Sequence, residues 1–269
     1  MFAKPTNPKL QRGHPLARNL VGAWLFTETT GSKAYDYSGY GATGLIANFT
    51  TADSTRWVGG NFGSSLLFNP VNPTTVTLGN PTQLNISGPF SISMWAFPTD
   101  VSAAWTTLFE KGYDGSFEAY LFRFVNIGGG FAQLQFGTYQ GAGDINHVAL
   151  SSNIAWTSIN GMWHHFAGTF DGGTYAVYMD GQLMGTRTDT FAPNITAINA
   201  NIGCSDVGAG PSRPFVGSID HAMIWNRGLS VTEINMLYQD PYQLFRKKRT
   251  FLKPIVSGGA RIIKHWFMH

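Results

Sequence analysis

The sequence has few charged residues and almost no cysteine. Charged residues make up 12% of its 269 residues, about half of the roughly 25% that is usual in soluble domains. Cys204 is the only cysteine, so the chain forms no internal disulfide and its folding does not depend on an oxidising compartment. A chain of this length can bury a sizeable core without covalent cross-links.

Segments that direct a chain to or through a membrane are also lacking. The first 20 residues hold two early prolines and no apolar stretch of the kind found in secretory signals. No apolar run approaches the roughly 18 residues that a membrane-spanning helix needs. We therefore expect the chain to be made in the cytoplasm without a signal peptide.

Catalytic motifs are absent as well. The sequence contains no His-Glu-x-x-His, no Gly-x-Ser-x-Gly and no phosphate-binding loop. Glycoside hydrolysis needs two carboxyl groups about 5 to 10 Å apart. Glu110 and Glu118 flank a predicted hairpin and could face each other, but we interpret them as residues that keep the turn soluble. We expect no enzymatic activity.

Glycine and aromatic residues are abundant and indicate strands joined by tight turns. The chain has 32 glycines, and 14% of its residues are aromatic. The stretch PFSISMWAFP (89–98) alternates, with Phe90, Ile92, Met94 and Ala96 on one face. About a dozen such short strands predict an all-β sandwich of two sheets. One short helix is expected after Ser230, because Glu233 completes a capping box with it.

Two adjacent histidines stand in the stretch NGMWHHFAGTFDGGTYAVYMDGQLMGTRTD (160–189). The period of two on a strand points His164 and His165 to opposite faces, so they do not readily share a metal or relay one proton. Asp180-Gly181 predicts a two-residue hairpin that sets Tyr178 against Leu183 and Val177 against Met184. We interpret the stretch as structural.

Basic residues are concentrated at both ends of the chain. Residues 1–20 hold four basic residues and no acid, and residues 246–269 hold seven and no acid, although the net charge of the whole chain is only +3. The C-terminal stretch also contains large apolar residues, which is unusual for a disordered tail. We expect a basic N-terminal arm (1–19), a β domain (20–245) and a basic, apolar C-terminal arm (246–269).

The order of these segments resembles the laminin G-like branch of the concanavalin A-like lectin/glucanase superfamily. The resemblance covers roughly residues 20–242, and it is most specific in the stretches WHHFAGTFDGGTYAVYMDGQLMG and FVGSIDHAMIWNRGLSVTEINMLYQDPY. It implies a jelly roll of two antiparallel sheets, one of them concave. Members mostly bind sugars or protein partners. The superfamily's glucanases carry a Glu-x-Asp-x-x-Glu strand, which this sequence lacks.

The resemblance also implies a calcium site. Its loop acid and its late-strand acid fall on Asp36 and Asp220, whereas a further acid of some relatives is replaced here by His221, a poor calcium ligand. The resemblance thus implies a calcium ion at Asp36 and Asp220, and His221 counts against it. The alternative is that both acids accept hydrogen bonds from backbone nitrogens.

Sugar binding would use exposed aromatic rings together with hydrogen-bonding side chains, although each such ring could instead close one end of the sandwich. The candidates lie in or beside loops, and they are Trp105, Tyr113, Tyr139, Asn146, His147, Trp156 and Asp206.

A lectin-like domain without an export signal and with two basic arms suggests a structural protein of a phage-type virion. In this hypothesis the protein is a capsid decoration or a tail-associated component at the virion surface. The arms bind another copy or another virion protein, and the loops contact glycans or the host. The arm residues concerned are Arg246, Lys247, Lys248, Arg249, Trp266 and Phe267.

Two other functions stay open. The chain could be a stand-alone carbohydrate-binding or adhesion module that is exported by another route. Nucleic acid is a possible partner from charge alone, but no recognised nucleic-acid motif supports it.

Overall fold

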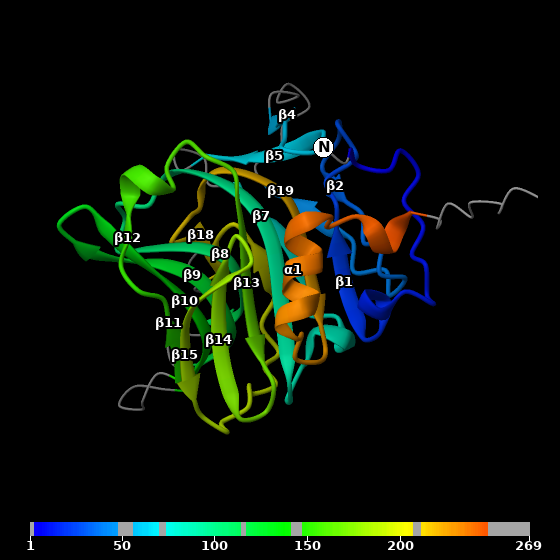
Figure 1. Ribbon diagram of the computed structural model, residues 1–269. Coiled ribbons are helices and arrows are strands. Elements are labelled where there is room, and N and C mark those ends of the chain that lie inside the picture. The colour runs from blue at the N-terminus through cyan, green and yellow to red at the C-terminus, as the bar shows by residue number, and fades with distance from the viewer. Residues whose placement is uncertain are drawn as a thin grey trace, which may run out of the picture.

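The protein folds as a sandwich of two antiparallel β-sheets. The computed structural model describes residues 3–47, 56–69, 74–113, 117–140, 147–206 and 211–246. These residues form nineteen strands, one α-helix, α1 (Val231–Gln239), and four 3-10 helices. With 48% of the described residues in strands, the predicted all-β jelly roll with one short C-terminal helix is confirmed (Figure 1).

The first sheet has eight strands and lies beneath helix α1. Across the sheet their order is β15 (Gln182–Thr188), β14 (Thr174–Met179), β13 (His164–Phe170), β7 (Phe90–Asp100), β19 (Val216–Trp225), β5 (Ser64–Phe68) and β4 (Trp57–Gly59), and β1 (Leu20–Trp24) also pairs with β19.

The second sheet has nine strands. Across the sheet their order is β11 (His147–Leu150), β10 (Phe131–Gln140), β9 (Phe117–Gly128), β8 (Trp105–Tyr113), β16 (Ala200–Ile202), β6 (Val76–Gly79), β3 (Gly44–Ile46) and β2 (Lys33–Ala34), and β12 (Ile154–Ala155) also pairs with β10. A two-stranded ribbon of β17 (Ser205–Asp206) and β18 (Pro211–Ser212) contacts β8.

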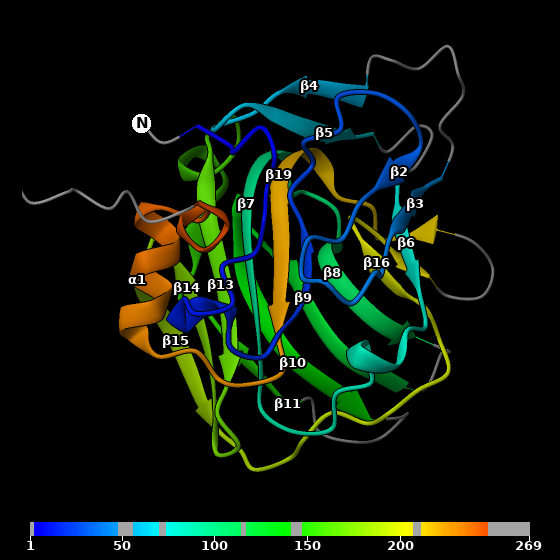
Figure 2. The same ribbon diagram turned by 90° about the vertical axis from the view of Figure 1, so that its right-hand side faces the viewer.

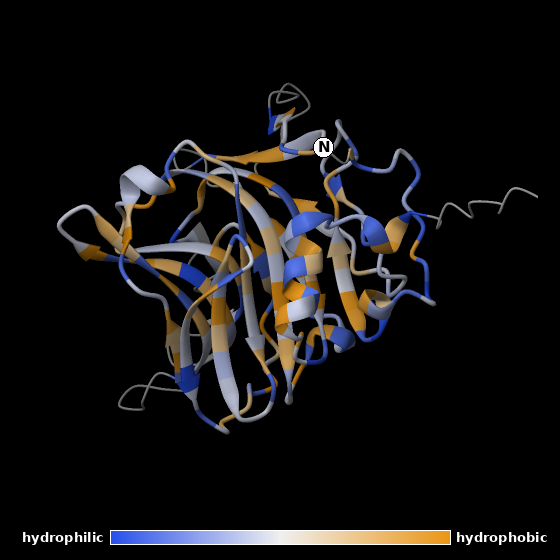
Figure 3. Ribbon diagram, in the orientation of Figure 1, coloured by the Kyte–Doolittle hydropathy of each residue, from blue (hydrophilic) through white to orange (hydrophobic). Residues whose placement is uncertain are grey.

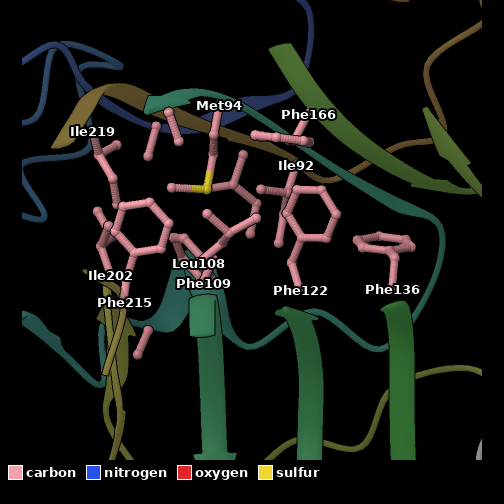
Figure 4. Close-up of a cluster of buried hydrophobic side chains, with 14 of the residues drawn as sticks. Ile92, Met94, Leu108, Phe109, Phe122, Phe136, Phe166, Ile202, Phe215 and Ile219 are labelled. Carbon is pink, nitrogen blue, oxygen red and sulfur yellow. The ribbon is translucent and has the colours of Figure 1, made fainter. Parts of the chain in front are cut away.

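The main core lies between the two sheets. The predicted alternation of β7 is confirmed, because Phe90, Ile92, Met94 and Ala96 are all buried in this layer. Figure 4 shows Ile92 and Met94 meeting Phe109 and Phe122, which come from the nine-stranded sheet. Hydrophobic and hydrophilic residues follow one another along the strands (Figure 3), as expected for strands with one face in a core.

The two sheets approach closely at Gly168 on β13. A Cβ atom at this position would lie 2.2 Å from the ring of Phe136 on β10. Only a glycine leaves room for the ring, so its place in the otherwise bulky run HHFAGTF follows from packing between the sheets.

A second apolar layer covers the other face of the eight-stranded sheet. Ile234 and Leu237 of α1 are buried there together with Trp95 and Trp225. The layer also includes η5 (Gln243–Phe245) and residues of the N-terminal segment, which carries η1 (Pro15–Ala17). The two remaining 3-10 helices are η3 (Thr82–Leu84) and η4 (Trp156–Ser158).

Residues 3–19 of the predicted N-terminal arm lie against the body of their own chain. Leu16 is fully buried, and its carbonyl oxygen accepts a hydrogen bond of 2.7 Å from the indole nitrogen of Trp225. Figure 2 shows this segment, in dark blue, leading from the N-terminus toward helix α1. The remaining arm residues Lys247, Lys248, Arg249, Trp266 and Phe267 lie outside the described residues.

The predicted β14–β15 hairpin forms, but one of its predicted pairs is wrong. Asp180 and Gly181 both have positive φ, 50° and 78°, and Tyr178 pairs with Leu183 as expected. Val177, however, pairs with Gly185 and not with Met184, because the register shifts between Val177 and Tyr178 and leaves Met184 as an extra residue on β15. The extra residue places Gly185 where a Cβ would lie 2.0 Å from the carbonyl oxygen of Leu150, so the bulge fits β15 against β11.

The two adjacent histidines point to opposite faces, as predicted. The Nδ1 atom of His164 lies 2.7 Å from the Oδ2 atom of Asp180. His165 is fully buried, and its Nε2 atom lies 2.9 Å from the hydroxyl of Ser93. Both side chains therefore have structural partners.

In the part of the chain that is described, no helix has the length and apolar character required to cross a membrane.

Candidate functional site

An exposed tryptophan stands at the start of β8. The side chain of Trp105 is 42% exposed, and its backbone pairs with Val125 on β9. The guanidinium of Arg213 lies 4.8 Å from the indole centroid, and that of Arg123 lies 5.8 Å away. Two cations therefore contact the ring and fix its orientation.

Arg123 belongs to a polar row on the face of the nine-stranded sheet that is turned away from the core. Its Nε atom donates a 2.7 Å hydrogen bond to Oε1 of Gln135 on β10, and its Nη1 atom lies 4.0 Å from Oε2 of Glu110 on β8. Oε1 of Glu110 accepts a hydrogen bond from the hydroxyl of Ser205. Arg123, Gln135 and Glu110 are all nearly buried, so the row forms a rigid support beside the indole.

Arg213 reaches the indole from the segment between β18 and β19. Its backbone is left-handed, with φ of 51°, which a non-glycine residue adopts only where the surroundings hold it. Its carbonyl oxygen accepts a 3.0 Å hydrogen bond from the backbone nitrogen of Thr107. The backbone of Arg213 is thus anchored to strand β8. We refer to Trp105, Arg123, Arg213, Gln135 and Glu110 as the Trp105 platform.

The Trp105 platform has the groups that sugar recognition requires. A flat apolar ring can pack against the C–H face of a pyranose or furanose, because aromatic side chains bury large apolar areas with a defined geometry. Guanidinium, amide and carboxylate groups around it can bind hydroxyl groups directionally.

Tyr113, Tyr139 and His147 do not gather around Trp105. Trp105 begins β8 and Tyr113 ends it, and a strand of this length separates its ends by about 25 Å. Tyr113 and Tyr139 both pair with Glu118 of β9, so they lie at the same end of the sheet. His147 lies at that end too, because it pairs with Thr138, the neighbour of Tyr139. The seven candidates therefore do not form one site.

Two of those candidates have structural contacts. The indole of Trp156 packs against the main core. The ring of His147 stacks on Phe191 at 4.1 Å, and its Nδ1 atom lies 2.7 Å from Oδ2 of Asp189. Tyr139 is half-buried on β10. Asn146 and the side chains of Tyr113 and Asp206 lie outside the described residues.

Asp36, one of the two predicted calcium ligands, accepts hydrogen bonds from strand β1 and from the turn that follows it. Its Oδ1 atom accepts from the backbone nitrogens of Ala23 (2.9 Å) and Ser38 (2.8 Å). Its Oδ2 atom accepts from the Ser38 hydroxyl (2.8 Å) and the Ala42 nitrogen (3.0 Å). Four donors satisfy this carboxylate, which is the capping geometry that an aspartate in a turn adopts.

Asp220, the second predicted ligand, is fully buried on β19. Its Oδ1 atom lies 3.1 Å from the ammonium of Lys4 and accepts a hydrogen bond from the Tyr242 hydroxyl, and its Oδ2 atom accepts from the backbone nitrogen of Phe62 at 3.2 Å. Burial alone would raise the pKa of Asp220, but Lys4 and the hydrogen bonds from His221 and Tyr242 outweigh it and keep that pKa below its ordinary value.

The two acids do not fit a shared calcium ion as they stand. Each carboxylate has a complete and separate set of partners, and within the described residues no three His, Cys, Asp or Glu side chains converge on one point. Calcium needs six to eight oxygen ligands. Calcium at Asp36 and Asp220 stays a prediction without support from this geometry.

The two glutamates that flank the β8–β9 turn are not cross-strand partners. Glu110 pairs with Leu121, whereas Glu118 pairs with Tyr113. Glu110 is nearly buried, with its Oε2 atom 4.0 Å from Nη1 of Arg123.

Four residues that are prominent in the structure are not among those predicted from the sequence. Arg123 and Gln135 could have been recognised as polar residues within otherwise apolar strands. Arg213 and Lys4 carry no such local signal, because their partners lie far away in the sequence. Arg246, which was predicted as an arm residue, instead pairs with Asp240 at 2.6 Å and donates to the carbonyl oxygen of Ala3 at 2.7 Å.

The fold and the sequence together define a class of protein. A family model described as "Concanavalin A-like lectin/glucanases superfamily" matches residues 72–235, more than half of the chain. The chain belongs to this family, as the resemblance indicated.

Among solved structures, the binding domain of Paraclostridial Mosquitocidal Protein 1 is similar with a TM-score of 0.62, 13% identity, and coverage of 83% of this chain and 52% of that one. Domain 4 of AbnA, an extracellular arabinanase from Geobacillus stearothermophilus solved in complex with arabinotriose, has a TM-score of 0.58 and 22% sequence identity. The match covers 82% of this chain and 98% of that domain. The binding domain of botulinum neurotoxin DC in complex with SialylT has a TM-score of 0.54 and 16% sequence identity. The match covers 83% of this chain and 52% of that one.

The chain thus spans about half the length of the two toxin binding domains and almost all of the arabinanase domain. At these identities the similarity shows the fold alone. No curated protein matches the chain.

Proposed function

We propose that the protein is a non-enzymatic carbohydrate-binding module and that the Trp105 platform is its sugar site. The observation that carries this proposal is the exposed indole of Trp105, whose centroid lies 4.8 Å from the guanidinium of Arg213 and 5.8 Å from that of Arg123, on the face of the nine-stranded sheet turned away from the core. A large aromatic ring that is exposed yet rigidly supported is the kind of residue that dominates binding energy.

The similar structures support the choice of probes. The arabinanase domain was solved with arabinotriose, a neutral sugar, and the neurotoxin binding domain with SialylT. Arabinotriose and SialylT are therefore the first two probes, followed by a broad glycan array.

The substitution Trp105→Ala tests the site. Binding of any glycan that the full chain recognises should weaken at least 10-fold, about 1.4 kcal/mol, because the stacking surface is lost. Titration calorimetry measures the affinity. Tyr40→Ala is the matched control, since Tyr40 is also an exposed aromatic residue, at 58%.

Unchanged affinity in Trp105→Ala, or equal losses in both variants, would rule out the Trp105 platform as the sugar site. Release of products from chromogenic or natural oligosaccharides would contradict the non-enzymatic part of the proposal.

A second proposal concerns the assembly in which the module works. The N-terminal segment exposes Lys9, Arg12 and Arg18, and a cavity of 290 Å³ is lined by Arg12, His14 and Arg246 among others. A basic surface of this kind suits a partner with an acidic surface. This supports a component of a phage-type virion, such as a capsid decoration or tail-associated protein at the virion surface. The alternative is a stand-alone adhesion module.

A further inference from the structure

Three polar rings lie in one row beneath the second apolar layer of the eight-stranded sheet. Trp95 on β7 pairs with His165 on β13 on one side and with His221 on β19 on the other. Both histidines are fully buried, and Trp95 is only 7% exposed. The rings of Trp95 and His165 have their centroids 5.9 Å apart. We call these three residues the Trp95 row.

Each ring of the Trp95 row has a buried nitrogen atom that meets no hydrogen-bond partner within the described residues. These atoms are Nε1 of Trp95, Nδ1 of His165 and Nε2 of His221. Buried polar atoms without a partner are rare, because each one gives up its hydrogen bonds to water without replacing them. Three such atoms in adjacent residues distinguish the row from the apolar side chains around it.

The two histidines have no place for an additional proton in this arrangement. The hydroxyl of Tyr242 donates to Oδ1 of Asp220 and lies 2.9 Å from Nδ1 of His221, so it accepts from that nitrogen, and Nε2 is the unprotonated atom of the neutral ring. Nε2 of His165 lies 2.9 Å from the Ser93 hydroxyl. When protonated, both rings therefore present a buried N–H group that meets no acceptor in the described part of the chain.

Two charged or titratable groups act on His165 from neighbouring elements. Asp180, in the turn between β14 and β15, favours its protonation, whereas His221 opposes it. Burial is the largest influence, and it lowers the pKa of His165 to about 3. Tyr238 of α1, whose ring centroid lies 6.1 Å from that of His165, brings no carboxylate to the row.

His221 is surrounded by three such groups. Oδ1 of Asp220 lies 3.4 Å from its Nδ1 atom and favours protonation. The same oxygen lies 3.1 Å from the ammonium of Lys4, which opposes protonation, and the third group is the hydroxyl of Tyr242. Burial is again the largest influence and keeps the pKa of His221 below its ordinary value. The closed structure therefore holds both histidines in their neutral form.

The C-terminal part of the described chain covers the Trp95 row. Tyr238 of α1 stacks on Trp95, with centroids 5.8 Å apart and ring planes at 10°. The ring of Tyr242 lies 5.2 Å from that of His221. All nineteen strands that the structure describes precede this part of the chain. Residues 229–246, which carry α1 and η5, can therefore leave the sheet without breaking any of these strand pairs.

We infer that the Trp95 row is an acid-sensitive latch for residues 229–246. At neutral pH the two uncharged histidines allow this segment to close over the sheet. In acid, each protonated ring requires water at a nitrogen atom that the segment covers, so the segment opens while the two sheets stay folded. This inference does not depend on the proposed sugar site.

Hydrogen–deuterium exchange of the full chain, followed by mass spectrometry at pH 7.0, 6.0, 5.0 and 4.5, tests the latch. After correction for the intrinsic pH dependence of amide exchange, the opening constant of the α1 amides should rise about 10-fold per pH unit below 6.5 through His165. His221 should add to this rise. At every pH the constant should stay at least 10-fold above that of β9 and β10, whose amides exchange only when the whole protein unfolds.

The variant His165→Gln assigns the effect to the row. Glutamine can bind the Ser93 hydroxyl but takes up no proton, so the rise for the α1 amides should be smaller by about 10-fold per pH unit. His147→Gln is the matched control, because His147 is a partly buried histidine of the other sheet. Its α1 amides should respond to pH as those of the wild type do.

Three results would overturn the latch. They are an opening constant of α1 that is independent of pH between 6.5 and 4.5, equal constants for α1 and for β9 and β10, and an unchanged response in folded His165→Gln protein. If His165→Gln does not fold, the comparison of α1 with β9 and β10 in the wild type decides alone.

Discussion

At the scale of single residues, the interior holds polar side chains that size and hydropathy alone would not place there. His165 and His221 flank Trp95 across strands β13, β7 and β19, and all three side chains are buried or nearly so. Burial lowers the pKa of His165 to about 3, and the neighbouring His221 adds to this effect. Burial lowers the pKa of His221 as well.

These two histidines predict a loss of stability in mild acid. In the unfolded chain a histidine has a pKa near 6.5, so below that pH protonation favours the unfolded state. The free energy of unfolding should fall as the pH drops from about 6.5 toward 4, by about 1.4 kcal/mol per pH unit from His165, and the lowered pKa of His221 adds to this fall. Urea unfolding at pH 7.5, 6.5, 5.5 and 4.5 measures this slope.

The variant His165→Gln separates this effect from general acid sensitivity. Glutamine can still bind the Ser93 hydroxyl but takes up no proton, so the slope of the variant should be shallower by about 1.4 kcal/mol per pH unit. Equal slopes for the wild type and the variant would show that His165 does not carry the pH dependence.

At the scale of elements, helix α1 has the clearest local determinants. The Ser230 hydroxyl accepts from the backbone nitrogen of Glu233, and the Glu233 carboxylate accepts from the backbone nitrogen of Ser230. Arg227 donates to both carboxylate oxygens of Glu233, at 2.7 and 2.9 Å. The first turn of α1 is thereby tied to the end of β19.

The substitution Ser230→Ala should destabilise the protein by about 1 kcal/mol, because the first turn of α1 loses its N-cap. For a domain of this size that corresponds to a fall in Tm of about 2 to 4 °C. Thr232→Ala, at an exposed position of the same turn, is the control and should leave the Tm nearly unchanged. A capping role would be contradicted if both variants melted alike.

The β14–β15 hairpin has one feature that its local sequence predicts and one that it does not. The Asp180-Gly181 turn was recognised because the sequence of a two-residue turn dictates its positive φ values. The bulge at Met184 was not predicted, because it depends on how β15 meets β11 and not on the sequence of the hairpin.

At the scale of the whole molecule, the two ends of the described chain lie together. Gln11 donates its backbone nitrogen to the carbonyl oxygen of Leu244 at 2.8 Å, and Arg246 contacts Ala3. The N-terminal segment is therefore part of the folded body, and the predicted assembly role is tested best at the C-terminal segment.

Light scattering on the full chain and on a chain ending at Arg246 tests that role. If the C-terminal segment is an assembly element, the full chain should form a defined oligomer and the shortened chain a monomer with unchanged Tm. If the full chain and the shortened chain are both monomers, self-assembly through residues 247–269 is excluded. A separate docking partner or a stand-alone module is then favoured.

The sequence by itself determined the fold class, the strand faces, the hairpin turn and the helix cap, because each of these depends on residues a few positions apart. Tertiary structure decided the sites. Trp105 was recognised as a candidate from its residue type, but Arg123 and Arg213 join it only because β9 and the segment after β18 lie beside β8. Lys4 meets Asp220 across 216 positions of the chain. Contacts of this kind depend on how the sheets and the arm are stacked, which local patterns do not encode.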